Sequence, residues 1–430
     1  MRIIADFHIH SYLSRATSKN MRIDDLSENG KLKGLGLIGT GDFTHPIWFE
    51  HIREKLANKE TSSGSGIFNF NGMNWMLTAE VATIYYEEGK SRKVHHVLHA
   101  PSFEAVEQIN EALSKHGNLK ADGRPILNTS SPELVEILTG ISKDILVYPA
   151  HAWTSWYGII GDFSGFDSIE DCYHDQTKHI HALETGMSSD PAMNWRVSSL
   201  DNFTLLSNSD SHSPWVWRIG REANVFELDK LTYKEINSAI VNKDTEKLKF
   251  TIEVEPSYGK YHFTGHRSCG INIHPNDAIK YGNQCPKCGH KLTIGVLQRV
   301  EKLADRPEGF VPENAIPFKS LLPLYEIISH AIGVNQLYSK RVIEMQNRLI
   351  KEFGNEFDVL LNASKEELLK AADEKVVDAI IKTRNGQVKY IPGYDGVYGI
   401  PVFSDKEYEK LKKKQIERVQ EQRSLKDFKK

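Results

Sequence analysis

The sequence predicts an α/β protein with a barrel in its first half, followed by a small zinc-binding module and an α-helical C-terminal domain. Three observations predict this. Short apolar runs alternate with helix-like segments up to residue 255, three of the four cysteines fall within twenty positions, and apolar residues recur at helical spacing after residue 320. A chain of 430 residues is too long for one ordinary small domain. We expect domains at 1–255, 256–300 and 301–430.

Composition limits the class of protein. The hydrophobic fraction of 40% and charged fraction of 26% are typical of a soluble globular protein, and the net charge of -3 argues against a uniformly basic nucleic-acid binder. Met1 leads directly into a strand of about five residues, far shorter than a signal or membrane helix. We therefore expect a cytoplasmic protein with no membrane contact. Most of the 18 histidines fall between His8 and His212, which indicates metal binding in the first half.

The chain opens with the apolar run Ile3–Ala5, which continues into Asp6-Phe7-His8-Ile9-His10. Residues two apart in an extended strand point to the same side, so His8 and His10 offer two imidazoles to one point. With an adjacent carboxylate they are good ligands for a borderline divalent ion. Many such triplets are only surface polar residues, so the assignment depends on the later strands.

Six further apolar runs follow the same pattern, because nearly all of them end in a histidine or a carboxylate. They are Leu35–Thr40 before Asp42, Trp75–Thr78 before Glu80, Lys93–Leu98 with His95 and His96, Asp144–Pro149 before His151, His181–Glu184, and Phe203–Ser207 before Asp210 and His212. In α/β barrels the chemistry lies at the carboxyl ends of the parallel strands. Any one of these residues alone is better explained as a cap or turn residue, but the repetition predicts a metal site.

These motifs together resemble the PHP (polymerase and histidinol phosphatase) family. The resemblance implies a distorted (β/α)7 barrel that holds two or three divalent ions, Zn²⁺, Mg²⁺ or Mn²⁺, for phosphoester hydrolysis. Carried over by position, the implied metal ligands are His8, His10, Asp42, Glu80, His95, His151, Asp210 and His212. On the fourth strand only one of His95 and His96 can join the site, since the two imidazoles face opposite ways, and the resemblance favours His95 because the apolar run from Val97 follows it as in that family. Glu80, Asp210 and His212 are the expected catalytic residues, and Asp210 is expected both to bind metal and to orient the attacking water.

The chain departs from this family at two positions. Phe43 stands where many members carry a histidine after the second motif's aspartate, and the usual third histidine of the first motif is absent around Ser14 and Arg15. His45 is a candidate substitute for one of them. We therefore expect two metal ions rather than three.

Aromatic and basic residues lie beside the predicted site. Five of the seven tryptophans follow its strand ends, and stacking on nucleobases typically contributes about 1 to 3 kcal/mol per base. Trp215, Arg218 and Arg221 are the candidate DNA contacts, because arginine can hold a phosphate bidentately. The alternatives are that the tryptophans seal the barrel rim and that the arginines pair with Glu222.

A second metal site is predicted from the cysteines. The stretch Cys285-Pro-Lys-Cys288 is followed by glycine and a predicted strand, Leu292–Val296, and His266-x-x-Cys269 supplies a matching pair sixteen residues earlier. One histidine and three cysteines form a tetrahedral set for one structural zinc ion. His274 and His290 compete with His266 for the fourth place. Cys172 is expected to be an ordinary buried thiol.

The last part of the chain is predicted to be helical, with a capping box at Ser364 to Glu367. It also carries the glycine-rich aromatic loop Tyr390–Gly399, in which Tyr394 is a candidate for stacking on a base. The alternative for this loop is a turn that packs on the zinc module.

The order of these parts, with Val300–Arg306 and Pro392–Gly396, resembles the endonuclease Q family over nearly the full length. The resemblance implies an enzyme that nicks DNA on the 5′ side of uracil, hypoxanthine, xanthine or an abasic site after turning the nucleotide out of the helix. We expect this enzyme to be a monomer. A replication or repair clamp is a candidate partner. The rival expectations are a phosphatase of a small phosphomonoester and a DNA-binding scaffold with a degenerate barrel.

Overall fold

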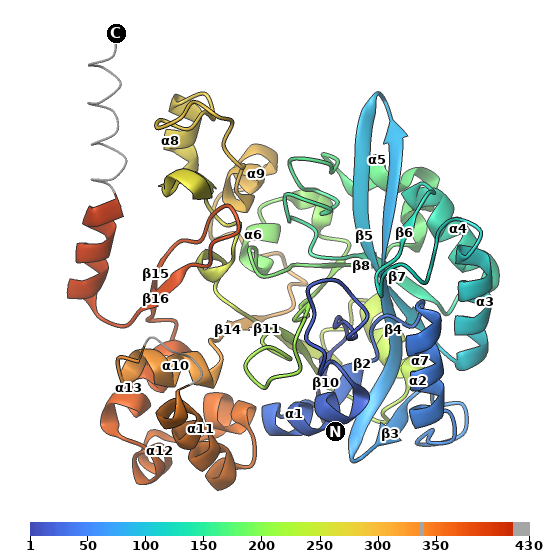
Figure 1. Cartoon of the computed structure of the whole chain (residues 1–430), viewed down its shortest axis with the longest axis horizontal. Coiled ribbons are helices and arrows are strands. Elements are labelled where there is room, and N and C mark those ends of the chain that lie inside the picture. The colour runs from blue at the N-terminus through green and yellow to red at the C-terminus, as the bar shows by residue number, and fades with distance from the viewer. Residues whose placement is uncertain (335–338, 416–430) are drawn as a thin grey trace.

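The structure, a computed structural model, describes residues 1–334 and 339–415, and the remaining residues of the predicted C-terminal domain lie outside this description. Seven strands surround the interior of the first domain (Figure 1). They are β1 (Arg2–Asp6), β2 (Leu37–Gly39), β4 (Met73–Glu87), β5 (Lys90–Ala100), β7 (Leu146–Pro149), β8 (Ala182–Glu184) and β9 (Thr204–Leu206). All seven predicted strands are present, and the predicted PHP-type α/β fold is confirmed.

The barrel interior is a single buried cluster to which every one of these strands contributes. Its members include Ala5, Leu37, Met76, Val97, Tyr148, Ala182 and Leu206, each with essentially no exposed surface. Burying such side chains stabilises the fold by about 25 cal/mol per Å² of apolar surface removed from water. This packed interior holds the strand ends, and the polar side chains on them, in fixed positions.

Strand direction differs from a regular parallel barrel. β1, β2 and β4 are parallel neighbours, whereas β5 runs antiparallel to both β4 and β7. The parallel pair β8 and β9 completes the ring, since the Ala152 amide donates to the Glu184 carbonyl (2.8 Å) and the His10 amide to the Ser211 carbonyl (3.1 Å). β4 and β5 form one long hairpin that projects beyond the barrel (Figure 1).

Further strands extend the sheet outside the ring. They are β3 (Phe68–Phe70) and β6 (Ile126–Leu127) beside β4, and β10 (Ala223–Glu227), β11 (Leu248–Glu253) and β14 (Phe318–Ser320) in succession beside β1. β14 comes from the predicted C-terminal domain, so the chain returns to the barrel sheet after the zinc module.

Helices cover the outside of the barrel. They are α1 (Ile23–Lys33), α2 (Pro46–Leu56), α3 (Phe103–Leu113), α4 (Ser131–Ile141), α5 (Ile169–Tyr173), α6 (Pro191–Asn194) and α7 (Tyr233–Val241). Short 3-10 turns lie at His174–His179, Ser198–Leu200, Pro256–Tyr258 and Arg267–Cys269. The Ser102 side chain accepts a hydrogen bond from the Ala105 amide at the start of α3 and so caps this helix.

The zinc module contains β12 (Thr264–His266), β13 (Ile271–Ile273) and α8 (Pro275–Lys280), and is followed by α9 (Val296–Leu303). The predicted strand Leu292–Val296 is wrong, because residues 291 and 293 make only isolated bridges and Val296 begins α9. The predicted boundary at residue 300 falls inside α9. Val296 and Val300 of this helix join the main hydrophobic core, which is why the helix continues across that boundary.

The C-terminal domain is helical, as predicted. Its helices are α10 (Leu324–Ala331), α11 (Lys340–Phe353), α12 (Lys365–Ala371) and α13 (Glu374–Arg384), with a π-helical turn at Asp358–Asn362. The capping box of Ser364 and Glu367 is present at α12. A short hairpin of β15 (Lys389–Ile391) and β16 (Ile400–Val402) follows, and residues 405–415 are helical.

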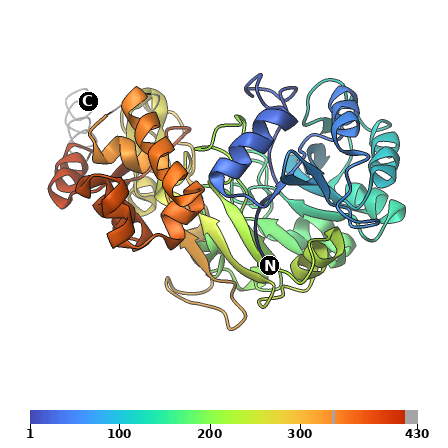
Figure 2. The same ribbon diagram turned by 90° about the horizontal axis from the view of Figure 1, so that it is seen from below.

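The three parts pack against one another (Figures 1 and 2), with the barrel on one side and the zinc module and helical domain on the other. The buried Arg299 of α9 donates to the carbonyl oxygens of Ile160 (2.8 Å) and Phe166 (2.7 Å) in the barrel. Lys33 of α1 forms a buried ion pair with Glu356 of the helical domain (2.7 Å). Within the described residues, no helix has the length and apolar character needed to cross a membrane.

Candidate metal centre

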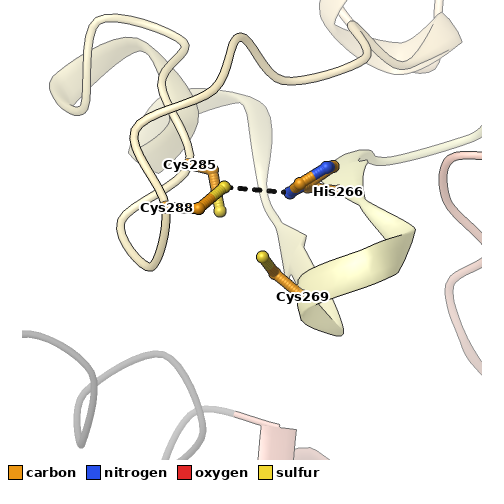
Figure 3. A group of neighbouring side chains, drawn as sticks. All are labelled: His266, Cys269, Cys285 and Cys288. Atoms are coloured by element: carbon orange, nitrogen blue, oxygen red, sulfur yellow. Dashed lines mark hydrogen bonds between the residues drawn. The ribbon is translucent and has the colours of Figure 1, made fainter.

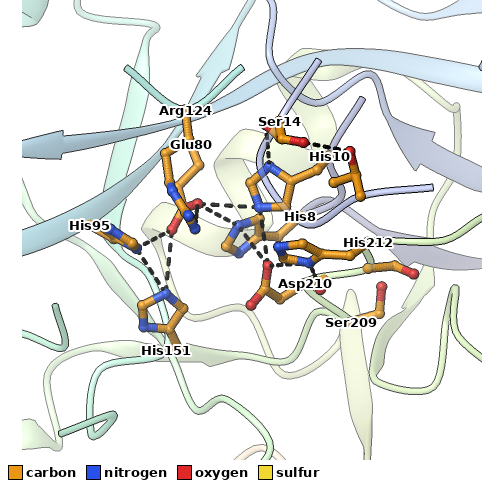
Figure 4. A network of polar contacts seen from close by, with 12 residues as sticks. His8, His10, Ser14, Glu80, His95, Arg124, His151, Ser209, Asp210 and His212 are labelled. Atoms are coloured by element: carbon orange, nitrogen blue, oxygen red, sulfur yellow. Dashed lines mark hydrogen bonds and ion pairs between the residues drawn. The ribbon is translucent and has the colours of Figure 1, made fainter. Parts of the chain in front are cut away.

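Glu80 lies at the middle of a cluster of histidines and carboxylates inside the barrel (Figure 4). Its Oε1 is 2.7 Å from His95 Nδ1 and 3.3 Å from His151 Nε2. Its Oε2 is 3.3 Å from His10 Nε2 and 3.5 Å from His8 Nε2. The carboxylate is fully buried and its two oxygens face two different sets of imidazoles.

The side chains form two groups of three candidate ligands. One group is His8, His10 and Asp210, and the other is Glu80, His95 and His151, with the ligand atoms of each group within 4.8 Å of one another. Among the described residues, His8 Nε2 and Glu80 Oε1 are buried close to other nitrogen and oxygen atoms of the cluster, but in positions that do not give a well-formed hydrogen bond. Buried nitrogen and oxygen atoms that face one another unpaired fit divalent cations. The residues present therefore fit two metal ions.

The structure separates His95 from His96. His95 lies in the second ligand group, whereas His96 points to the other side of β5, where Nδ1 lies 2.9 Å from the Tyr173 hydroxyl and Nε2 lies 3.1 Å from Thr83 Oγ1. Side chains of neighbouring residues in a strand point to opposite faces. The geometry thus places the preferred histidine, His95, at the site.

Asp42, a predicted ligand, lies behind His10. Its Oδ1 is 3.0 Å from His10 Nδ1, and its Oδ2 accepts hydrogen bonds from the Ser11 amide (2.6 Å) and the Ser14 hydroxyl (2.8 Å). Among the described residues Asp42 belongs to neither ligand group. This position differs from the prediction, because both oxygens are already engaged and the carboxylate holds His10 with Nε2 toward the site.

The departures from the PHP pattern have structural explanations. Phe43 is fully buried in the main hydrophobic core, so the position after Asp42 contributes to packing. Ser14, near the position of the absent third histidine, donates to Asp42. His45 precedes α2 and, among the described residues, belongs to neither ligand group.

Glu184 was not among the predicted site residues. It is fully buried at the end of β8, with Oε2 3.0 Å from His8 Nδ1, and Oε1 accepts from the His151 amide (3.1 Å). It therefore supports one ligand from each group. The available signal was its position at a strand end, which the sequence pattern shares with the ligands.

Arg124 was also missed. Its Nη1 lies 3.1 Å from Glu80 Oε2, and Figure 4 shows the guanidinium pointing at the cluster from a loop. About a quarter of its side chain is exposed. A single arginine in a loop carries no spacing signal, so the sequence could not identify it.

The backbone at the site is strained. Asp42, His151 and Asp210 have positive φ angles of 48°, 30° and 45°. Left-handed conformations of non-glycine residues cost of order 1 to 3 kcal/mol each and cluster at functional sites. Asp6 helps to hold this geometry, because it accepts from the amides of Ser209 (3.1 Å) and Gly220 (2.8 Å) on either side of Asp210.

The carboxylates of the cluster are ionised, although Glu80 is fully buried and Asp210 is mostly buried. Burial raises the pKa of Glu80, but His95, Arg124 and His8 outweigh it and hold the pKa well below its ordinary value. Burial likewise raises the pKa of Asp210, and His212 and His10 lower it well below its ordinary value. An ionised carboxylate is the form that binds a metal ion.

The histidines differ in charge. Burial lowers the pKa of His95 to about 4, with Glu80 opposing only part of the effect, so its imidazole is neutral and available as a ligand. Burial also lowers the pKa of His8 and His10, but neighbouring carboxylates outweigh burial and raise both pKa values well above normal. The largest of these opposing effects comes from Glu184 for His8 and from Asp42 for His10. In the cation-free protein these two imidazoles therefore hold protons, which a metal ion must displace.

Asp210 and His212 lie at the open side of the cluster. Each has 32% of its side chain exposed, whereas the side chains of His8, His10 and Glu80 are at most 1% exposed. Asp210 Oδ1 is 3.1 Å from His10 Nε2. His212 Nδ1 is 3.0 Å from the Asp210 carbonyl oxygen, to which its N–H can donate, and the lone pair is then on Nε2.

The predicted structural zinc ligands also come together (Figure 3). The ligand atoms of His266, Cys269, Cys285 and Cys288 lie within 4.8 Å of one another, and Cys288 Sγ is 3.4 Å from His266 Nδ1. A backbone hydrogen bond from His290 leads the causes that lower the pKa of Cys288 to about 6, so this thiol ionises readily. His274 instead accepts from the Asn276 amide at the start of α8. The geometry thus supports His266 as the histidine ligand, and Cys172 is buried elsewhere.

The candidate DNA contacts have different surroundings. Trp215 stacks on Trp217, and the Arg218 guanidinium lies 5.8 Å from the centre of the Tyr398 ring. Arg221 donates to the Ser209 carbonyl oxygen (3.0 Å) and so supports the segment that carries Asp210. The fourth candidate, Tyr394 in the aromatic loop, packs against Gly265 of the zinc module. The contact is so close that a Cβ atom at Gly265 would lie 2.5 Å from the Tyr394 ring.

Comparison with known proteins places these features in context. A family model described as the MJ0043 C-terminal domain matches residues 323–387. The chain is 37% identical over 259 residues to the protein MJ0043 of Methanocaldococcus jannaschii, a match that covers 60% of this chain and 32% of that protein. It is 28% identical over 413 residues to the protein YqxK of Bacillus subtilis, which covers 93% of this chain and 98% of that protein.

Two solved structures match almost the whole chain. One is the lesion-specific endonuclease PfuEndoQ from Pyrococcus furiosus, with 35% identity and a TM-score of 0.84 over 94% of this chain and 96% of that one. The other is endonuclease Q in complex with a 27-mer duplex substrate that has an abasic lesion at the active site. It has 35% identity and a TM-score of 0.85 over 94% of this chain and 98% of that one.

Proposed function

The chain belongs to the endonuclease Q family, and from this we propose that it is a metal-dependent DNA repair endonuclease acting at damaged nucleotides. The proposed cut is on the 5′ side of uracil, hypoxanthine, xanthine or an abasic site. The observation that carries the proposal is Glu80, whose two oxygens face two ligand groups at one end of the barrel. The likeness to an endonuclease Q bound to lesion-containing duplex supports DNA as the substrate.

The protein's own residues divide the work of hydrolysis. Two divalent ions held by His8, His10, Asp210, Glu80, His95 and His151 would activate water and stabilise the charge on the phosphate and departing oxygens. Asp210 lies at the open side and orients the attacking water. His212 accepts at Nε2 the proton that the attacking water releases, since burial lowers the pKa of His212 and favours the neutral imidazole. Arg124 holds a phosphate oxygen beside Glu80.

The substrate reaches this centre from the open side, where Asp210 and His212 are exposed. Arg218 and Lys260 both lie over the Tyr398 ring, at 5.8 and 4.7 Å, and provide positive charge for the DNA backbone. The damaged nucleotide turns out of the stack, which costs least where pairing is already weak. The protein acts on DNA as a monomer in the cytoplasm, and a replication or repair clamp is a candidate partner.

The test is a nicking assay on an end-labelled duplex with one abasic site, deoxyuridine or deoxyinosine, in Mg²⁺ or Mn²⁺. We expect one nick, on the 5′ side of the lesion, which disappears with a chelator and on an undamaged duplex. Rapid hydrolysis of a small phosphomonoester without nicking would favour the phosphatase alternative. Tight binding without any hydrolysis, in protein that holds only one zinc ion per chain, would favour the scaffold.

A further inference from the structure

Two aromatic side chains are stacked in the open on the loop that follows the ligand His151. The rings of Trp156 and Phe163 have centroids 3.8 Å apart and an interplanar angle of 19°. Trp156 is 43% exposed and Phe163 is 41% exposed. Trp153 on the same loop is 1% exposed and donates from Nε1 to Asn194 (2.8 Å), which is the behaviour of a core residue.

The loop fixes this pair beside the metal centre. Tyr157 follows Trp156, and its ring centroid lies 4.3 Å from that of the ligand His95. The Tyr157 carbonyl oxygen also accepts from the His95 amide (3.0 Å). Gly161 packs so closely that a Cβ there would lie 2.2 Å from the Thr154 carbonyl oxygen, so the loop is tightly closed on itself. The exposed pair is therefore held on the rim next to a ligand.

A lysine lies near each of two aromatic rings of this loop. Lys291 of the zinc module has Nζ 5.6 Å from the centre of the Phe163 ring, and Lys93 of β5 has Nζ 5.8 Å from the centre of the Tyr157 ring. The hydroxyl of Ser155 donates to the Ile294 carbonyl oxygen (2.8 Å) and ties the loop to the zinc module. Aromatic faces flanked by lysines are the combination that single-stranded nucleic acid binds, through base stacking and phosphate contact.

The size of the pair identifies the class of ligand. The exposed surface of two side chains is far smaller than the roughly 800 Å² that each partner buries in a stable protein interface. The outer face of an indole matches one nucleobase. We propose that Trp156 and Phe163 form a platform that stacks one nucleobase unstacked from the substrate duplex near the lesion, with Lys291 on the adjacent phosphate. This inference rests on the proposed nuclease function.

The test measures nicking and stacking separately. For Trp156→Ala in metal-loaded, full-length protein we expect kcat/KM for a damaged duplex to fall by about 5- to 150-fold, mainly through KM. Trp156→Phe should recover part of the loss. The second readout is emission from 2-aminopurine, placed in turn opposite the lesion and at each flanking position. At one position the wild-type protein should quench the emission and Trp156→Ala should not.

Phe310 provides the matched control. It is also exposed and lies under a cation, with the Arg306 guanidinium 4.3 Å from its ring centre, but it belongs to the segment between α9 and β14. That segment projects on the same side as the N-terminus (Figure 2), whereas the metal centre lies at the other end of β1. Phe310→Ala should leave both readouts unchanged.

The possible failures can be told apart. Unchanged kcat/KM and unchanged 2-aminopurine emission in a folded Trp156→Ala protein that nicks normally would overturn the platform and leave the nuclease intact. Full quenching by wild type and partial or full quenching by Trp156→Phe, with none by Trp156→Ala, supports it. Failure of the wild-type protein to bind or nick damaged duplex contradicts the proposed function itself.

Discussion

At the scale of single residues, the candidate centre depends on carboxylates in two different positions. Glu80 faces both ligand groups directly, whereas Asp42 and Glu184 lie behind His10 and His8. A carboxylate behind an imidazole fixes its tautomer and ring orientation, so that Nε2 presents its lone pair to the site. The carboxylates of Asp42 and Glu184 thus hold the rings of His10 and His8 in fixed orientations, so that both buried imidazoles can face the same small site.

Asp210→Asn tests the residue assigned to the attacking water. We expect nicking of a damaged duplex to fall by about 10²- to 10⁴-fold, because the amide is neutral and cannot orient water or bind an ion as a carboxylate does. Asparagine tolerates the left-handed backbone at this position, where φ is 45°, so the fold should remain. DNA affinity, measured by fluorescence anisotropy, should change by no more than a few-fold.

The matched control for that variant is Asp229→Asn. Asp229 is exposed and lies just after β10, whose end pairs with the beginning of β1 and is thus remote from the centre. Nicking should be unaffected. If Asp210→Asn nicks at a wild-type rate, or loses DNA binding as completely as nicking, the assigned role is wrong.

At the scale of elements, the sequence identified all seven barrel strands but not their pairing. The long strand β4 runs past Glu80 to Glu87 and folds back as β5, so Glu80 and His95 lie inside strands rather than at their ends. An apolar pattern reports burial and leaves strand direction open. The direction of each strand depends on its tertiary contacts. Tertiary contacts also explain why Leu292 to Val296 do not form a strand.

The zinc module is an element whose stability should depend on its metal. Within the described residues its separate hydrophobic core consists of the buried side chains of Ile271, Ile273, Ala278, Cys285 and Leu292, with the partly buried Cys269 and Tyr281 packed against them. So small a core needs a metal or disulfide to fold, and metal binding then supplies the folding free energy. The aromatic loop depends on it too, since Asp395 accepts from the Arg267 amide (2.6 Å) and the Thr293 hydroxyl (2.8 Å).

Cys285→Ser should therefore remove one zinc ion per chain and unfold the module locally. We expect hydrogen exchange to accelerate in residues 264–294 and 390–399, while the barrel strands keep their protection. Metal content is measured in parallel by atomic emission. Cys172→Ser, which changes a buried thiol of the barrel, is the control and should retain zinc. Unchanged exchange in the module of a zinc-free Cys285→Ser protein would contradict a structural role.

At the scale of the whole molecule, the three parts are joined by contacts between residues far apart in the chain. Lys33 and Glu356 are separated by 323 positions, and Arg299 reaches back to a barrel loop. Sequence spacing carries no information about such pairs, which is also why Arg124 was missed. The residues of the two candidate ligand groups were predictable because each follows or lies within an apolar strand.

The buried ion pair between α1 and the helical domain gives the last prediction. Lys33 and Glu356 are at most 1% exposed, and Glu356 also accepts from the Leu324 amide (3.2 Å) and the Gln346 side chain (3.2 Å). Lys33→Met leaves a buried carboxylate without its cation, so unfolding in urea should become easier by about 3 to 5 kcal/mol. The double variant Lys33→Met with Glu356→Gln should recover most of that loss, because no charge is left unpaired.

The control is Lys340→Met, which breaks the exposed pair with Glu344 and should lower the free energy of unfolding by less than about 1 kcal/mol. Equal costs for the buried and the exposed substitution would show that the pair does not hold the two domains together.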